Sequence, residues 1–89
     1  MLKKEIAAGT VHALPHDLRE ILAADRQALA LWEEITPLAR NEWICWVEDA
    51  RKPHTRLRRL ERVPAELREG MRRPCCWAGC PHRIKNGRA

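Results

Sequence analysis

The chain has no tyrosine and no phenylalanine, so its four tryptophans supply all of its aromatic volume. It has no apolar run near the ~20 residues that a membrane-spanning helix needs. It also has no recognisable secretory signal, because Glu5 and Gly9 interrupt the residues that follow Lys3 and Lys4. No segment alternates apolar and polar residues for long enough to predict a β-strand. We therefore expect a helical protein of the cytoplasm.

The composition that is present predicts one small domain whose two halves carry opposite charge. Eighty-nine residues suffice for a single modest core. Residues 1–50 hold five Lys/Arg and nine Asp/Glu, a balance of −4, whereas residues 51–89 hold twelve and three, a balance of +9. Either the two halves attract each other within the fold, or the basic excess faces an anionic partner such as nucleic acid, a lipid surface or an acidic protein.

Apolar spacing and helix-start signals predict an all-α fold, a compact bundle of four to five short helices with an irregular C-terminal tail. We expect helices over residues 17–24, 26–34, 37–52, 54–62 and 65–69. Asp25 and Thr36 are favoured N-cap residues, and Pro37 suits the first position of a helix. Pro64 is expected to break or kink the fourth helix or to begin the fifth, which Gly70 would end.

The core is predicted around large apolar side chains, with Trp43 and Trp46 at its centre. Its expected members are Trp32, Trp43, Trp46, Ile21, Leu57 and Leu60. Cys45 is interpreted as a small core residue without a histidine nearby. Around this core we expect three segments: a flexible leader at residues 1–13, the helical domain at 14–73 and a cysteine-containing tail at 74–89.

Several short motifs occur at characteristic separations. They are Pro15, Asp17 and Leu18, then Trp43, Trp46, Ala50 and Arg51, then Thr55, Arg56 and Arg59. On these motifs, residues 14 to about 73 resemble the OmdA-type family, which is described as bacteriocin-protection, YdeI-like or OmpD-associated proteins. The resemblance implies a compact helical module with a role in bacterial resistance to antimicrobial peptides or bacteriocins, with links to outer-membrane porins. It brings no catalytic residues.

Two features depart from this family pattern. Pro64 interrupts what is usually a longer final helix, so the geometry after Arg62 is open. Larger relatives also carry an additional domain upstream of this module, and a function that resides in that domain is not transferred to this chain.

The tail contains a cluster of potential metal ligands. Four of them, Cys75, Cys76, Cys80 and His82, lie within eight residues. Zinc prefers tetrahedral Cys/His sets, which usually combine two ligands from one segment with two from a distant one. No distant second pair is evident here, although Cys76 or an upstream histidine could complete a site made of Cys75, Cys80 and His82. We expect no cofactor and a reduced tail in which Trp77 folds back onto the helices. A zinc-binding protein remains an alternative function.

The region around residues 51–62 forms a second candidate site, a basic binding face. Its members are Arg51, Arg56, Arg58, Arg59 and Arg62. Arginine binds phosphate bidentately, which makes a nucleic-acid-binding module the other alternative. The competing interpretation is structural: the arginines pair with acidic residues such as Glu42, Glu48 and Asp49, Thr55 caps the helix, and Arg56 reaches back to the preceding helix end.

Signals for catalysis are missing. There is no Gly-x-Ser-x-Gly elbow, no phosphate-cradling glycine loop and no carboxylate pair in an apolar setting. His12, His16 and His54 are scattered and are interpreted as surface residues. The leading hypothesis is therefore a non-enzymatic interaction module that acts through a protein partner.

Overall fold

The computed structural model describes residues 6–74, 77 and 80, and these residues form an all-α fold. Its helices are α1 (His16–Ala23), α2 (Arg26–Glu34), α3 (Pro37–Glu48) and α4 (Pro53–Arg68). Among the described residues there is no β-strand, and none of the helices is both long and apolar enough to cross a membrane. The prediction of a compact helical bundle is confirmed.

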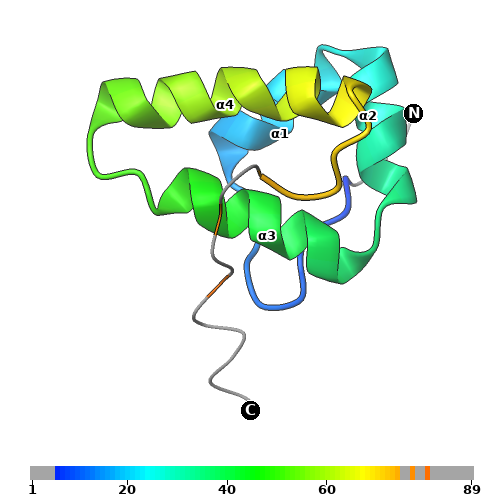
Figure 1. The fold of residues 1–89 in the computed structure, drawn as a ribbon, viewed down its shortest axis with the longest axis horizontal. Helices are drawn as coiled ribbons and strands as arrows, with labels where there is room; N and C mark the ends of the chain where they lie inside the picture. The colour runs from blue at the N-terminus through cyan, green and yellow to red at the C-terminus, as the bar shows by residue number, and fades with distance from the viewer. Residues whose placement is uncertain (1–5, 75–76, 78–79, 81–89) are drawn as a thin grey trace.

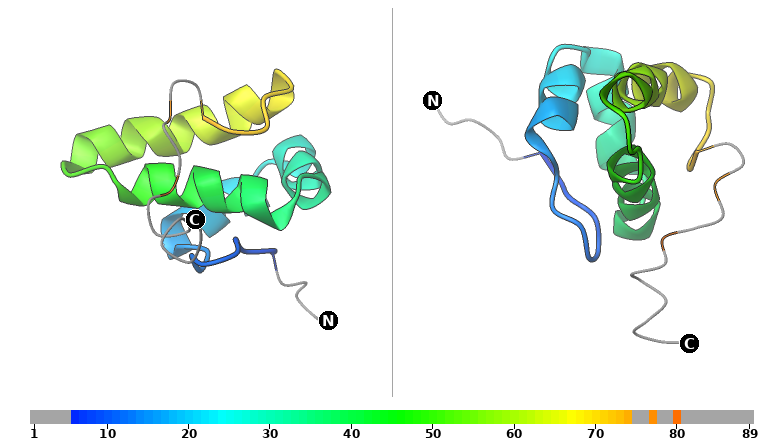
Figure 2. Two further views of the ribbon diagram at one scale, coloured as in Figure 1. Left: turned by 60° about the horizontal axis from the view of Figure 1, so that its bottom comes forward. Right: turned by 90° about the vertical axis from the view of Figure 1, so that its left-hand side faces the viewer.

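α4 packs against each of the other three helices. α3 and α4 lie side by side and run in opposite directions, as Figure 1 shows, while α1 and α2 pack on each other and on α4. The right-hand view of Figure 2 places the described part of the leader on one side of α3 and the described residues after α4 on the other. This arrangement puts α3 between the two ends of the described chain.

The predicted helix starts of α2 and α3 are confirmed. The side chain of Asp25 accepts a hydrogen bond from the backbone N–H of Ala28, and that of Thr36 accepts one from Ala39. α3 ends at Glu48, four residues earlier than expected. Lys52, the last residue expected in this helix, is extended, because a residue before proline is pushed out of the helical region.

The expected break at Pro64 is wrong, since α4 continues through this residue as one 16-residue helix. Leu60, Val63 and Leu67 are buried on a single stripe that extends to both sides of the proline, so packing holds the helix together. Gly70 ends α4 as predicted. Its φ of 93° closes a Schellman motif, in which its N–H donates to the Leu67 carbonyl.

The predicted core is largely confirmed. Trp32, Trp43, Trp46 and Leu60 are buried, and Ile21 is partly buried against them. Leu57 is the wrong member, because its side chain is 54% exposed. In place of Leu57, the buried stripe of α4 includes Val63 and Leu67, the second of which lies beyond Pro64.

Residues 6–13, expected as part of a flexible leader, lie against α2 and α3 and hydrogen-bond to both. The indole N–H of Trp32 donates to the carbonyl of Ala7 at 2.8 Å. The guanidinium of Arg40 donates to the carbonyl of Ala8 at 3.0 Å. These side chains satisfy backbone groups that belong to no helix, and they fix the path by which the leader reaches α3.

Candidate functional site: a histidine–cysteine cluster

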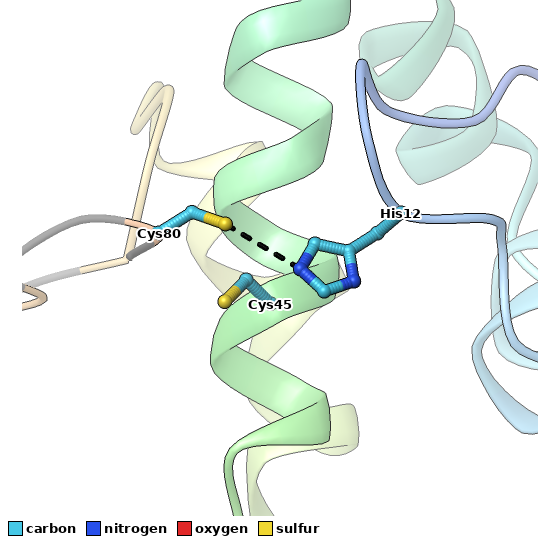
Figure 3. A group of neighbouring side chains, drawn as sticks. All are labelled: His12, Cys45 and Cys80. Carbon is cyan, nitrogen blue, oxygen red and sulfur yellow. Dashed lines mark hydrogen bonds between the residues drawn. The ribbon is translucent and has the colours of Figure 1, made fainter. Parts of the chain in front are cut away.

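Three residues from distant parts of the sequence converge beside α3. The donor atoms of His12, Cys45 and Cys80 all lie within 4.8 Å of one another. Figure 3 shows the imidazole of His12 and the thiol of Cys80 pointing toward each other, with Cys45 on α3 next to them. Cys80 is 0% exposed and Cys45 is 3% exposed. We refer to these three residues as the His–Cys cluster.

Asn41 of α3 positions the backbone that carries His12. Its side-chain oxygen accepts hydrogen bonds from the N–H groups of Val11, at 3.0 Å, and of His12, at 2.9 Å. The leader crosses α3 very closely here, since a Cβ built on Gly9 would lie 2.5 Å from the Cα of Asn41. This contact requires glycine.

Two carboxylates of α3 orient the other groups of the cluster. Glu48 lies 3.0 Å from Nδ1 of His12, which directs the opposite ring nitrogen toward Cys80, where the Nε2 to Sγ distance is 3.4 Å. Glu42 accepts a hydrogen bond from the backbone N–H of Cys80 at 2.9 Å. Through these contacts, α3 binds both the leader, which carries His12, and the segment after α4, which carries Cys80.

The environment disfavours a thiolate at Cys45 in the absence of a cation. Burial is the main cause that raises the pKa of Cys45 to about 12, and contacts with Cys80 and the nearby carboxylate of Glu42 add to it. Such a thiol is a poor nucleophile. A cavity of about 280 Å³, lined by His12, Cys45, Glu48 and Asp49, opens beside the cluster and gives access from the surface.

The cluster combines one residue from the predicted ligand set with two that the sequence analysis interpreted otherwise. Cys80 was a candidate ligand, whereas the other three candidates, Cys75, Cys76 and His82, lie outside the described residues. His12 was expected at the surface and Cys45 was expected to have no histidine nearby, and both interpretations are wrong. No local spacing reveals the cluster, because His12 and Cys80 are 68 positions apart.

The five arginines of the basic face are not all exposed. Arg56 forms a two-bond ion pair with Asp17 of α1. Arg62 pairs with Glu66, and its guanidinium lies 5.1 Å from the centre of the Trp46 ring. The other members are Arg59, which also contacts Trp46, and the exposed Arg51 and Arg58.

Some of these contacts join the two halves of the chain as expected, and the pair of Arg59 with Asp49 involves an expected partner. The pair of Arg62 with Glu66 lies within the basic half. Arg59, and not Arg56, donates to a carbonyl near the end of α3, that of Trp46, at 2.7 Å. Thr55 does not cap α4, whose N-cap residue is Lys52 and has no side-chain capping bond. Ion pairs of Arg59 with Asp49 and of Arg68 with Asp25 add to the pairing between the halves.

A second surface feature lies between α1, α2 and the leader. It is a pocket of about 350 Å³ that is lined by Ile6, His16, Arg19, Glu20, Ala23, Leu29 and Glu33. His16 is exposed as expected and lies 3.0 Å from the carboxylate of Glu20, one turn along α1. We refer to this feature as the α1–α2 pocket.

Comparison with known proteins adds one positive finding. The family model OmdA, described as "Bacteriocin-protection, YdeI or OmpD-Associated", matches residues 12–70, which is more than half of the chain. The match spans α1 to α4 and includes His12 and Cys45, but it ends before Cys80. Neither the curated proteins nor the solved structures include a significant match. The chain therefore belongs to the OmdA family of bacteriocin-protection, YdeI or OmpD-associated proteins.

Proposed function

We propose that this protein is a non-enzymatic bacterial binding module that contributes to antimicrobial-peptide or bacteriocin protection by binding cationic amphipathic peptides in the α1–α2 pocket. The observation that carries the proposal is the combination of an apolar lining with carboxylates in that pocket. We propose the cytoplasm as the location of this activity.

The pocket offers complementary chemistry for such a peptide. Ile6, Ala23 and Leu29 provide apolar surface that can cover one aliphatic or aromatic side chain. Glu20 and Glu33 are exposed carboxylates of the same pocket and outnumber its one arginine, Arg19. They can pair with lysine or arginine at the neighbouring peptide positions, Glu20 by exchanging its contact with His16. Its volume of about 350 Å³ is near the lower end for ligand sites, which suits one anchoring side chain.

The family description gives this chemistry a biological context. Antimicrobial peptides commonly form amphipathic helices with Lys/Arg on one face and Trp, Phe or Leu on the other. A helix of this kind can insert an apolar residue between α1 and α2 while its cations meet the glutamates. The pocket belongs to the acidic half of the sequence, which further favours a cationic ligand.

The test is fluorescence anisotropy with a labelled cationic amphipathic helical peptide. Ala23→Trp fills the pocket from an exposed position, so we expect at least a tenfold loss of affinity while the circular dichroism spectrum stays helical. Ala30→Trp is the matched control, because Ala30 is also exposed but does not line the pocket. Unchanged binding by Ala23→Trp, or equal loss in both variants, would contradict the proposal.

Charge provides a second readout. Glu20→Gln combined with Glu33→Gln is expected to weaken binding and to reduce its dependence on salt, since two ion pairs are removed. Glu61→Gln on the exposed side of α4 serves as the control. A peptide of the same apolar pattern with its lysines replaced by glutamine should bind poorly to the wild-type protein. Equal binding of both peptides would exclude the electrostatic part of the proposal.

A further inference from the structure

We propose that the His–Cys cluster is a zinc site, in which His12 Nε2, Cys45 Sγ and Cys80 Sγ bind one Zn²⁺ that joins the leader, α3 and the tail. One imidazole and two thiolates are a ligand set that zinc selects over harder ions such as magnesium or calcium. The structure supplies the distant ligands that were not evident within the tail sequence.

The donor geometry is close to that of a bound metal. In a tetrahedral zinc site with Zn–S near 2.3 Å and Zn–N near 2.0 Å, a sulfur and a nitrogen lie about 3.5 Å apart and two sulfurs about 3.8 Å apart. His12 Nε2 and Cys80 Sγ are already 3.4 Å apart. All three donor atoms lie within 4.8 Å of one another. Side-chain rotations that move the donor atoms by about 1 Å therefore bring them to coordinating distance.

Groups around the donors supply the hydrogen bonds that orient a zinc-bound histidine. Metal-ligating histidines usually have their other ring nitrogen bonded to a carboxylate or carbonyl, which sets the tautomer. Here Glu48 holds Nδ1 of His12 at 3.0 Å and leaves Nε2 facing the sulfurs. Glu42 accepts a hydrogen bond from the backbone of Cys80, and Asn41 accepts one from that of His12, so α3 positions both ligands that lie outside it.

The local charge also favours a cation. The carboxylate of Glu42 lies beside the donors, where it accepts a hydrogen bond from the backbone of Cys80, and its negative charge attracts Zn²⁺. Binding of one Zn²⁺ to two thiols and one neutral imidazole forms two Zn–S bonds and one Zn–N bond, and it releases two protons to solvent. The cavity lined by Cys45, Glu48 and Asp49 provides the access path.

The experiment measures metal content and affinity on the full chain purified with a reductant. Elemental analysis is expected to find one zinc per chain. After chelation, titration with Co²⁺ should produce the sulfur-to-cobalt charge-transfer absorption of a thiolate site, and addition of Zn²⁺ should displace it. Chelation should also lower the melting temperature, because a structural metal contributes folding free energy.

Variants test the assignment residue by residue. Cys45→Ser and Cys80→Ser should abolish the charge-transfer absorption or reduce it strongly, and His12→Gln should lose metal affinity without creating a buried cavity. Glu48→Gln should weaken binding by about 10- to 100-fold, because it removes the carboxylate that orients the imidazole of His12. His54→Ala is the control, because His54 is exposed and outside the cluster.

Separate variants of Cys75, Cys76 and His82 identify which residue, if any, supplies the fourth ligand. The proposal is overturned by protein that binds no zinc after reconstitution, or by zinc that His12→Gln and Cys80→Ser leave in place. It is also overturned if mass spectrometry of protein purified with a reductant finds Cys45 and Cys80 joined by a disulfide and no bound metal.

Discussion

α3 and α4 are neighbours, yet they are buried in different ways. In α3, eight consecutive residues from Arg40 to Val47 are buried, so the helix is covered on every side. In α4, burial follows one stripe of Leu60, Val63, Glu66 and Leu67 along a helix that is otherwise largely exposed. The difference arises because the leader and the chain after α4 cover the sides of α3 that the helices leave open.

This comparison explains why α3 contains buried polar residues. Arg40 donates to the carbonyls of Trp32 and Ile35 at the end of α2, where a cation is favoured by the helix dipole. Asn41 and Glu42 bind backbone N–H groups of the covering segments. A helix covered by irregular chain must satisfy the hydrogen bonds of that chain, whereas a helix covered by other helices does not.

The largest expected effect is at the centre of α3. Trp43 is 0% exposed, stacks edge-on against Trp46 and donates its indole N–H to the carbonyl of Arg72 at 3.0 Å. Trp43→Ala should lower the free energy of unfolding by about 3–5 kcal/mol. Leu57→Ala on α4 should change it by less than about 0.5 kcal/mol, because that side chain is mostly exposed. Urea unfolding measures both, and similar losses would remove the contrast between the helices.

The next effect concerns the attachment of the leader to α3. Asn41→Ala removes the acceptor of two partly buried N–H groups, at Val11 and His12, and should cost about 2–3 kcal/mol of unfolding free energy. Hydrogen exchange at these two amides should accelerate more than exchange within α4. Gln27→Ala on the exposed face of α2 is the control. Unchanged exchange at both amides would show that the leader is held by other contacts.

A substitution at Pro64 tests whether packing keeps α4 helical despite the cost of a proline inside the helix. Pro64→Ala should restore the missing backbone hydrogen bond and raise the free energy of unfolding by about 1–2 kcal/mol, since proline inside a helix costs about 3 kcal/mol and part is offset in the unfolded chain. Pro53→Ala at the first helical position should be nearly neutral. Thermal unfolding distinguishes the two, and destabilisation by Pro64→Ala would contradict this account.

The smallest expected change in stability comes from removing the ion pair between Asp17 of α1 and Arg56 of α4. The hydrogen bond from Arg56 is the main cause that lowers the pKa of Asp17, so the pair stabilises the fold above the ordinary Asp pKa and the stabilisation is lost as the pH falls through the lowered value. Asp17→Asn should cost less than about 1 kcal/mol at pH 7, because the side chain is 41% exposed. The difference from wild type should shrink below about pH 4, whereas Glu61→Gln should show no such change.

The elements that could be predicted from the sequence are those fixed by neighbouring residues. The caps at Asp25 and Thr36, the stop at Gly70 and the burial of the three helical tryptophans all follow from local chemistry and spacing. The path of α4 through Pro64 could not be predicted, because the local cost of proline is outweighed by packing of residues on both sides of it.

The candidate site was predictable only in part, because it too depends on contacts between residues far apart in the sequence. Cys80 stood out as a ligand type, but its neighbours in space come from the leader and from the middle of a core helix. The residues that bring them together, Asn41 and Glu42, are polar and lie outside the apolar spacing that predicts the core, although both are buried. Long-range hydrogen bonds of this kind have no periodic signature.

The crossing of the leader over α3 constrains how the sequence can vary at position 9. A side chain on Gly9 would meet the backbone of α3 at Asn41, and a smaller residue at position 41 could not relieve that clash. The backbone N–H of Gly9 donates to the carbonyl of His12, so the crossing and the histidine belong to one tight turn. A single methyl group at position 9 would therefore act at a distance, displacing the imidazole from the two thiols without altering any of the three residues themselves.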